Sequence, residues 1–255
     1  MNLFELTGIE LKKLRRSKIL LILTTAVLIL WLPSILNASI NFEMSDVGIS
    51  PEHNFLIQGL LGMAWFMYPA CMVVATVLVT QTERGSRGIL KMLSLPVSTT
   101  RLSLAKFIIL LGLSALQMIL TAGTYVVSAA ITTHLQHYDF SLPLPYVLKL
   151  CGLLYLTSIP MLAFFWMTAV CIDTPIFSIG IDLASIVPSV LIMNTKLWFL
   201  YPMAYPLYVI TSEYGRVAEH MDTWNTNLFP WIPVACLITL VSLLISCICF
   251  GKSEK

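Results

Sequence analysis

Three places in this chain have residue types and spacings that chemistry could use. His134 and His137 are three residues apart and Asp139 follows, so two imidazoles on one helix face could bind a metal ion. No further ligand cluster accompanies them, and we expect a solvated turn and no metal site. The stretch Gly251–Ser253 resembles the end of a phosphate-binding loop, but Ser246 stands where that loop requires its first glycine. We therefore expect no ATP site, no other cofactor and no catalytic residue in this chain.

Asp182 is the third place, because it is the only carboxylate well inside a long apolar stretch. Burying its charge costs several kcal/mol unless the group is paired or protonated. One interpretation makes it a polar contact for a substrate or a proton-sensitive latch. The other, which we favour, is a carboxyl hydrogen-bonded to a hydroxyl or backbone group of a neighbouring helix. Pro175 and Pro188 bracket Asp182 and should loosen its helix.

The composition identifies the surroundings in which such residues must be placed. Of the 255 residues, 58% are apolar and only 11% are charged, and the mean hydropathy is +0.86. A water-soluble enzyme needs far more polar residues on its surface, and a disordered chain has far fewer apolar ones. The alternation of a membrane barrel is missing as well. The sequence therefore predicts an all-α integral membrane protein, with membrane lipids and no nucleic acid among its partners.

Six apolar stretches are long enough to cross a bilayer, which takes about 20 residues. We expect one transmembrane domain over residues 1–255. The expected spans are 19–38, 56–80, 105–133, 147–170, 176–196 and 229–250. The stretch 197–212 is apolar but short, rich in Trp and Tyr, and holds two prolines. It predicts a re-entrant or an interfacial element before the sixth span, and the sequence leaves that choice open.

The positive charges predict the orientation of these spans. Five Lys and Arg precede the first span, five lie between the second and third, and two follow the sixth, so twelve of the 15 lie on one side. Because Lys and Arg are retained in cytoplasmic loops, both termini are expected in the cytoplasm. Apolar and basic residues of the stretch 1–18 recur at helical spacing: Leu3, Leu6, Ile9 (or Glu10), Lys13 and Leu14. They predict an amphipathic helix lying on anionic headgroups.

The cytoplasmic stretch between the second and third spans is the most informative part of the sequence. From about Ser86 it can form a short helix with Arg84, Arg87 and Lys91 on one side and apolar residues on another. Pro96 ends that helix, and the Ser98 hydroxyl is expected to cap the helix that follows. A short amphipathic helix here either rests on the membrane or docks into a groove of a cytoplasmic partner.

This stretch resembles the signature of ABC-2 type permeases of ATP-binding-cassette transporters. In those proteins a Glu at the end of the second span is followed by a Gly, a coupling helix, a Leu-Pro-hydroxyl turn and a basic residue. The matching positions here are Glu83, Gly88, Leu90–Leu93, Leu95–Ser98, and Arg101 with Lys106. The resemblance implies docking to an ATPase through Glu83, Arg87, Leu90, Lys91, Leu93 and Pro96.

The resemblance also implies the partners and a class of substrate. Two copies of a cytoplasmic ATPase would bind ATP and Mg²⁺, and a second permease, identical or paralogous, would complete the channel. The chain is similar to permeases that protect bacteria from lantibiotics, the mutacin and epidermin immunity group, and more distantly to bacitracin-resistance permeases. We thus expect a bacterial plasma-membrane exporter of an amphipathic peptide. An ion-coupled secondary transporter using Asp182 is the alternative; it would be expected to show repeated halves.

Overall fold

The computed structural model describes residues 3–14, 18–43, 48–84, 98–218 and 228–252. Within these ranges the chain forms helices and no strands. The elements are α1 (Leu3–Leu14), α2 (Ile19–Leu36), α3 (Ile40–Glu43), α4 (Pro51–Gly62), the π-helix η2 (Met63–Met67), α5 (Tyr68–Arg84), α7 (Thr99–Gln136), α8 (Leu144–Cys171), α9 (Pro175–Ile186), α10 (Ser189–Ile192), the 3₁₀ turns η3 (Trp198–Leu200) and η4 (Pro202–Ala204), α11 (Tyr205–Val217) and α12 (Leu228–Lys252).

Six of the described helical stretches are long and apolar enough to cross a membrane, which confirms the predicted fold class. They are Ile19–Leu36, Pro51–Gln81, Thr99–Gln136, Leu144–Cys171, Pro175–Ile192 and Phe229–Phe250. The third is longer than the expected span 105–133. Its 38 helical residues extend about 57 Å, whereas the hydrocarbon core is about 30 Å thick. A helix of that length can project beyond the hydrocarbon, where polar residues are tolerated, so hydropathy alone underestimated it.

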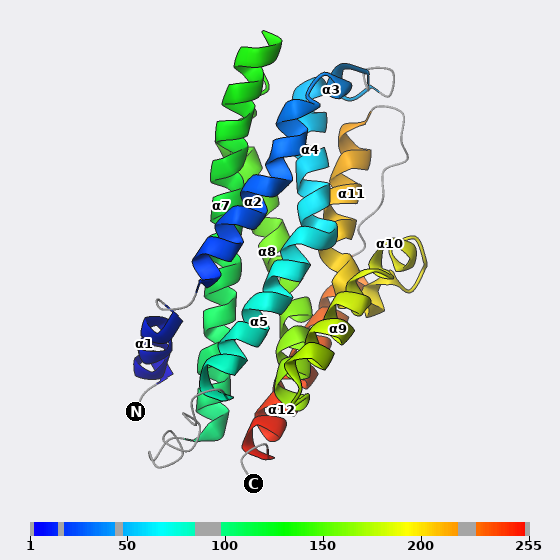
Figure 1. Ribbon diagram of the computed structural model, residues 1–255. Helices are drawn as coiled ribbons and strands as arrows, with labels where there is room; N and C mark the ends of the chain where they lie inside the picture. Colours follow the sequence, from blue (N-terminus) through cyan, green and yellow to red (C-terminus); the bar gives the residue numbers. More distant parts are fainter. Residues whose placement is uncertain (1–2, 15–17, 44–47, 85–97, 219–227, 253–255) are drawn as a thin grey trace.

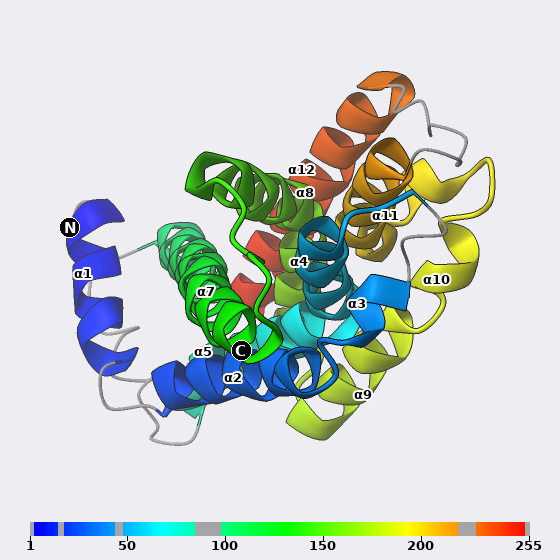
Figure 2. The same cartoon turned by 90° about the horizontal axis from the view of Figure 1, so that it is seen from above.

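The helices form a bundle around α8, which packs against α5, α7, α11 and α12 (Figures 1 and 2). In Figure 1 both chain termini lie at the lower end of the bundle, beside the end of α5 and the start of α7. The helix α2 packs along α7 and α4. We call the end that carries the termini the near end, and the end that carries α3 the far end.

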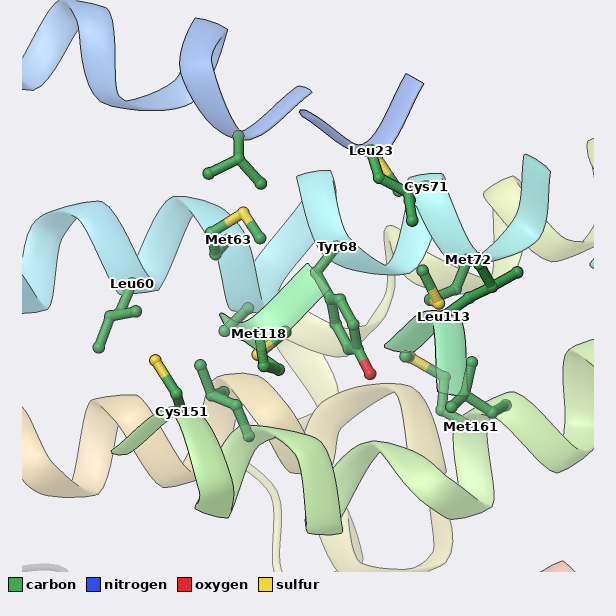
Figure 3. Packing of buried hydrophobic residues seen from close by; sticks show 14 of the residues in the cluster. Leu23, Leu60, Met63, Tyr68, Cys71, Met72, Leu113, Met118, Cys151 and Met161 are labelled. Carbon is green, nitrogen blue, oxygen red and sulfur yellow. The ribbon is translucent and has the colours of Figure 1, made fainter. Parts of the chain in front are cut away.

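The second span is one helical stretch widened by a π-turn near its middle. It consists of α4, η2 and α5, and Tyr68 is the first residue after the π-turn. The fully buried Tyr68 hydroxyl lies 2.5 Å from the hydroxyls of both Ser114 on α7 and Ser158 on α8. Figure 3 shows the ring directed away from its own helix, among apolar side chains of the core. A π-turn locally breaks the regular ladder, so this tyrosine joins three helices at the point where the second span is irregular.

Close packing of a tryptophan fixes α2 against α4. Trp31 is buried, and its ring centroid lies 5.6 Å from those of Phe55 and Tyr125. A Cβ atom at Gly59 would lie only 2.5 Å from the Trp31 ring, so no larger residue fits there without displacing the indole. The far halves of the first two spans are thus held in one arrangement by aromatic contacts.

Two prolines determine where helices begin in the stretch 197–212. Pro202 is the first residue of η4 and Pro206 the second of α11, positions at which a missing backbone N–H costs nothing, so both prolines lie at helix starts. The helix α11 then packs between α4 and α8 instead of lying flat on a surface. In Figure 1, α9 rises from the near end, α10 lies beside the middle, and α11 continues to the far end. The aromatic residues pack together, and the ring centroids of the stacked Trp198 and Tyr208 lie 3.7 Å apart.

Candidate functional site

The near end of the bundle holds the two helix ends that flank the stretch expected to dock an ATPase. Glu83 lies in the last turn of α5, and α7 begins at Thr99. Arg87, Leu90, Lys91, Leu93 and Pro96 lie outside the described residues, and so does the coupling helix that they were expected to form. Ser98 occupies the predicted N-cap position of α7, but its hydroxyl makes no cap hydrogen bond; its backbone carbonyl accepts the first helical bonds from Arg101 and Leu102.

The helix α1 packs against the start of α7 at this end. Leu6 is buried in a small apolar cluster with Leu102 and Ala105, and Phe250 of α12 packs against it. Other parts of the α1 surface are open, since Ile9 is 42% and Leu11 61% exposed. Among the residues expected to recur along this helix, Leu6 therefore faces the bundle and Ile9 does not. These contacts place the first helix, the start of the third span and the end of the sixth at one end of the molecule.

A buried ion pair reinforces this contact. Glu10 is 3% exposed and Lys106 is fully buried, and the Lys106 ammonium donates to Glu10 Oε2 at 3.1 Å. Lys106 also lies 3.4 Å from the carbonyl oxygen of Val79 on α5. Lys13, one turn along α1, donates to the other Glu10 oxygen. The pair therefore joins α1 to α7 and, through the Val79 carbonyl, to α5. The helices α5 and α7 lie on the two sides of the stretch 85–97.

The electrostatics of Glu10 favour its charged form. Burial alone would raise its pKa, but the positive charges of Lys106 and Lys13 and their hydrogen bonds hold the pKa below its usual value. Because the folded-state pKa is lowered, the stabilisation is present above the unfolded-state pKa and is lost as the pH falls through the lowered one. At neutral pH the near end is held by a charged pair.

Asp182 lies in a different place, at the contact between α9 and α8. Its carboxylate is fully buried, and the Thr168 hydroxyl lies 2.7 Å and 2.9 Å from its two oxygens. Ser178, one turn before it on α9, lies 3.5 Å from Oδ2. The structure thus surrounds Asp182 with hydroxyl groups on its own helix and on its neighbour, and the role of the carboxylate stays a prediction.

The histidines of the sequence analysis lie at the end of α7. His134 is in its last turn, and His137 ends the helix in the left-handed conformation, with φ of 53°. Within the described ranges no three His, Cys, Asp or Glu side chains gather closely enough to hold a metal ion.

Comparison with known families decides the class of this protein. Residues 6–189, more than two thirds of the chain, match the family of ABC-2 family transporter proteins. The chain belongs to this family. It is a multi-pass membrane permease subunit of an ABC transporter, and membership implies an ATP-binding-cassette partner. Comparisons with curated proteins and with solved structures gave no match.

The part of the permease that matches the family runs from α1 to the start of α10 and so includes Glu10, Lys106 and Asp182. The pairing of Glu10 with Lys106 was not predicted from the sequence. One signal was available, because Lys106 is followed by a run without Asp, Glu, Lys or Arg, residues 107–138, and a cation at the start of such a span needs a partner. In the amphipathic helix expected over residues 1–18, Glu10 was named only as an alternative to Ile9.

Substitutions of Asp182 separate its two interpretations. Asp182→Asn keeps the shape and the hydrogen-bonding capacity, so we expect near-normal amounts of permease and near-normal transport. Asp182→Leu removes the partner of two buried hydroxyls and should cost about 1–3 kcal/mol, seen as less permease in the membrane. Asp173→Leu, at an exposed position before the same helix, is the control and should lower the amount less. Normal amounts of an Asn variant without transport would show that the charge itself is functional.

Proposed function

We propose that this permease exports an amphipathic antimicrobial peptide of the lantibiotic class out of the bacterial membrane in which the peptide acts. The observation that carries the transport role is the family match over residues 6–189. The peptide class is supported by the likeness in size and layout to lantibiotic-protection permeases. Bacitracin, a peptide antibiotic of another class, is the second candidate substrate.

The proposed complex contains two ATPase copies and a second permease, identical or paralogous. ATP and Mg²⁺ would be bound by the ATPase, since the phosphate-binding motif is missing from this sequence. The conformational change that hydrolysis drives in the ATPase would be transmitted to the membrane spans through the near end. The ATPase would contact the stretch from Glu83 to Pro96, and the helices on both sides of that stretch are joined by the Glu10–Lys106 pair.

The proposed orientation puts the near end in the cytoplasm. Both termini lie at that end in Figure 1, and so do the start of α7 and the end of α5. Six of the twelve Lys and Arg expected in the cytoplasm lie in described helices that meet there, as the retention of positive charge on the cytoplasmic side requires: Lys12, Lys13, Arg84, Arg101, Lys106 and Lys252. The far end, with α3 and the ends of α7 and α11, would then face the outside.

Co-expression in a susceptible bacterium tests this function. The permease is tagged and produced with a candidate ATPase, and growth is measured in nisin, a lantibiotic, and in bacitracin. We expect the ATPase to copurify and the cells to tolerate several times more nisin, but only with an ATPase that hydrolyses ATP. Protection against bacitracin alone would support the export function but show that the substrate is bacitracin and not a lantibiotic. Protection without an active ATPase would contradict the exporter.

A further inference from the structure

A polar pocket lies at the far end between α2 and α4, which pack side by side in both views (Figures 1 and 2). Its volume is about 330 Å³, within the range of pockets that hold small ligands or parts of larger ones. Side-chain amides dominate its polar lining: Asn37, Asn41, Asn54 and Gln58. Such a concentration of amides is unusual in a chain of which 58% is apolar.

The amides form a directed chain of hydrogen bonds from the interior to the pocket mouth. Asn41 donates to the carbonyl of Ala38 at 2.8 Å, and Asn54 donates to Asn41 Oδ1 at 2.8 Å. Gln58 reaches Asn54 Oδ1 at 3.5 Å. Asn41 and Asn54 are buried and Gln58 is exposed. The inner amides are therefore fixed by one another and hold the outermost one in place.

The mouth of the pocket offers both donors and acceptors. The side-chain oxygens of Ser34, Asn37 and Gln58 accept no hydrogen bond from any described residue, and each can face a ligand. None of the described residues that line the pocket is charged, while Phe55 and Pro33 supply apolar walls. A peptide bond carries one donor and one acceptor and is flanked by side chains, so it matches this lining.

Two acidic residues lie on the helices that form the pocket. Glu43 ends α3, two residues after Asn41, and Glu52 is in the first turn of α4, two residues before Asn54; side chains two apart on a helix point to different sides, so both carboxylates lie outside the pocket lining. Glu43 is exposed and Glu52 is partly exposed, and the Tyr138 hydroxyl donates to Glu52 at 2.6 Å. Negative charges beside a neutral pocket would attract a ligand that carries positive charge next to its amide groups.

We infer that this pocket binds a backbone segment of a cationic amphipathic peptide at the far end of the permease. The pocket amides hold one or two peptide bonds, the apolar walls take an adjoining side chain, and Glu43 with Glu52 attracts Lys residues of the ligand. This inference deepens the proposed function and rests on it, because it assigns a binding site to the peptide that the permease exports.

Binding of fluorescein-labelled nisin to the purified permease–ATPase complex in phosphatidylcholine nanodiscs tests the site, with empty nanodiscs as the blank. Asn37→Leu and Gln58→Met keep side-chain size at exposed positions and should each weaken binding by about tenfold, as expected for one or two lost hydrogen bonds. Asn194→Leu is the matched control. Asn194 is also exposed and also donates to the carbonyl four residues earlier at 3.1 Å, as Asn37 does, but it lies outside the pocket.

The outcomes separate this inference from the function on which it rests. No binding of nisin above the blank by the unaltered complex would contradict the peptide substrate, and the pocket assignment with it. Normal binding by both pocket variants would overturn the pocket assignment alone. Reduced binding of labelled phosphatidylglycerol by both pocket variants, with nisin binding unchanged, would assign the pocket to a lipid headgroup instead.

Discussion

Replacing Leu90 and Leu93 together with Asp should abolish the copurification of the ATPase while the permease still inserts into the membrane. A fully buried Leu contributes about 1.5–3 kcal/mol, and an Asp in its place adds the cost of burying charge. The sum weakens an ordinary complex by several powers of ten. Because the stretch between the second and third spans is expected in water, insertion should not suffer. Recovery of the ATPase with a tagged permease from a detergent extract measures the effect.

A matched variant shows whether this loss is specific. Leu11→Asp places a charge at a 61% exposed position of α1, at the same end of the bundle, and should leave the ATPase bound. Protection against the peptide should disappear together with the ATPase in the double variant only. If the helix instead rests on headgroups, the double Asp variant would keep its ATPase, and the docking assignment would be wrong.

The second large effect is expected at the pair Glu10–Lys106. Glu10→Met leaves the fully buried Lys106 without this carboxylate and should cost about 3–5 kcal/mol. Lys106→Met should cost less, because Glu10 keeps its bond to Lys13. Thermal unfolding can be followed in detergent by a thiol-reactive dye, since Cys71 and Cys151 are buried and become reactive on unfolding. The midpoint should fall most for Glu10→Met.

The double variant Glu10→Met with Lys106→Met distinguishes a pair from two independent contributions. Apolar residues of similar size replace buried ion pairs at little cost, so the double variant should be more stable than Glu10→Met. ATPase recovery should follow the same order if the pair positions the stretch between α5 and α7. Additive losses in the double variant would show that the two residues do not act together.

The spans of this permease were predictable because the bilayer imposes one simple requirement. A charge-free run of about 20 residues has few alternatives in a chain this apolar, and all six predicted spans overlap those of the structure. The ends were harder to predict. The helix α7 begins at Thr99 and α4 at Pro51, several residues earlier than expected, because polar residues continue a helix beyond the hydrocarbon without any change in backbone structure.

The contacts between distant residues could not be read from the sequence. Glu10 and Lys106 are 96 positions apart, and five basic residues between the second and third spans were equally available as partners. Only the packing of Leu6 on Leu102 and Ala105 selects Lys106. Likewise, hydropathy identified Asp182 as a buried carboxylate but could not identify Thr168 of α8 as the hydroxyl beside it. The amide pocket had no signal, because its residues come from three separate helices and a connection.

Transport by the purified complex tests the account most directly. The permease and its ATPase are reconstituted into phosphatidylcholine vesicles, and the distribution of fluorescein-labelled nisin between the two leaflets is followed by an impermeant quencher. The account predicts movement of the peptide toward the face opposite the ATPase on addition of ATP with Mg²⁺, and none with an ATPase that cannot hydrolyse ATP. Movement that needs no ATP and follows an imposed proton gradient would contradict it and favour ion coupling through Asp182.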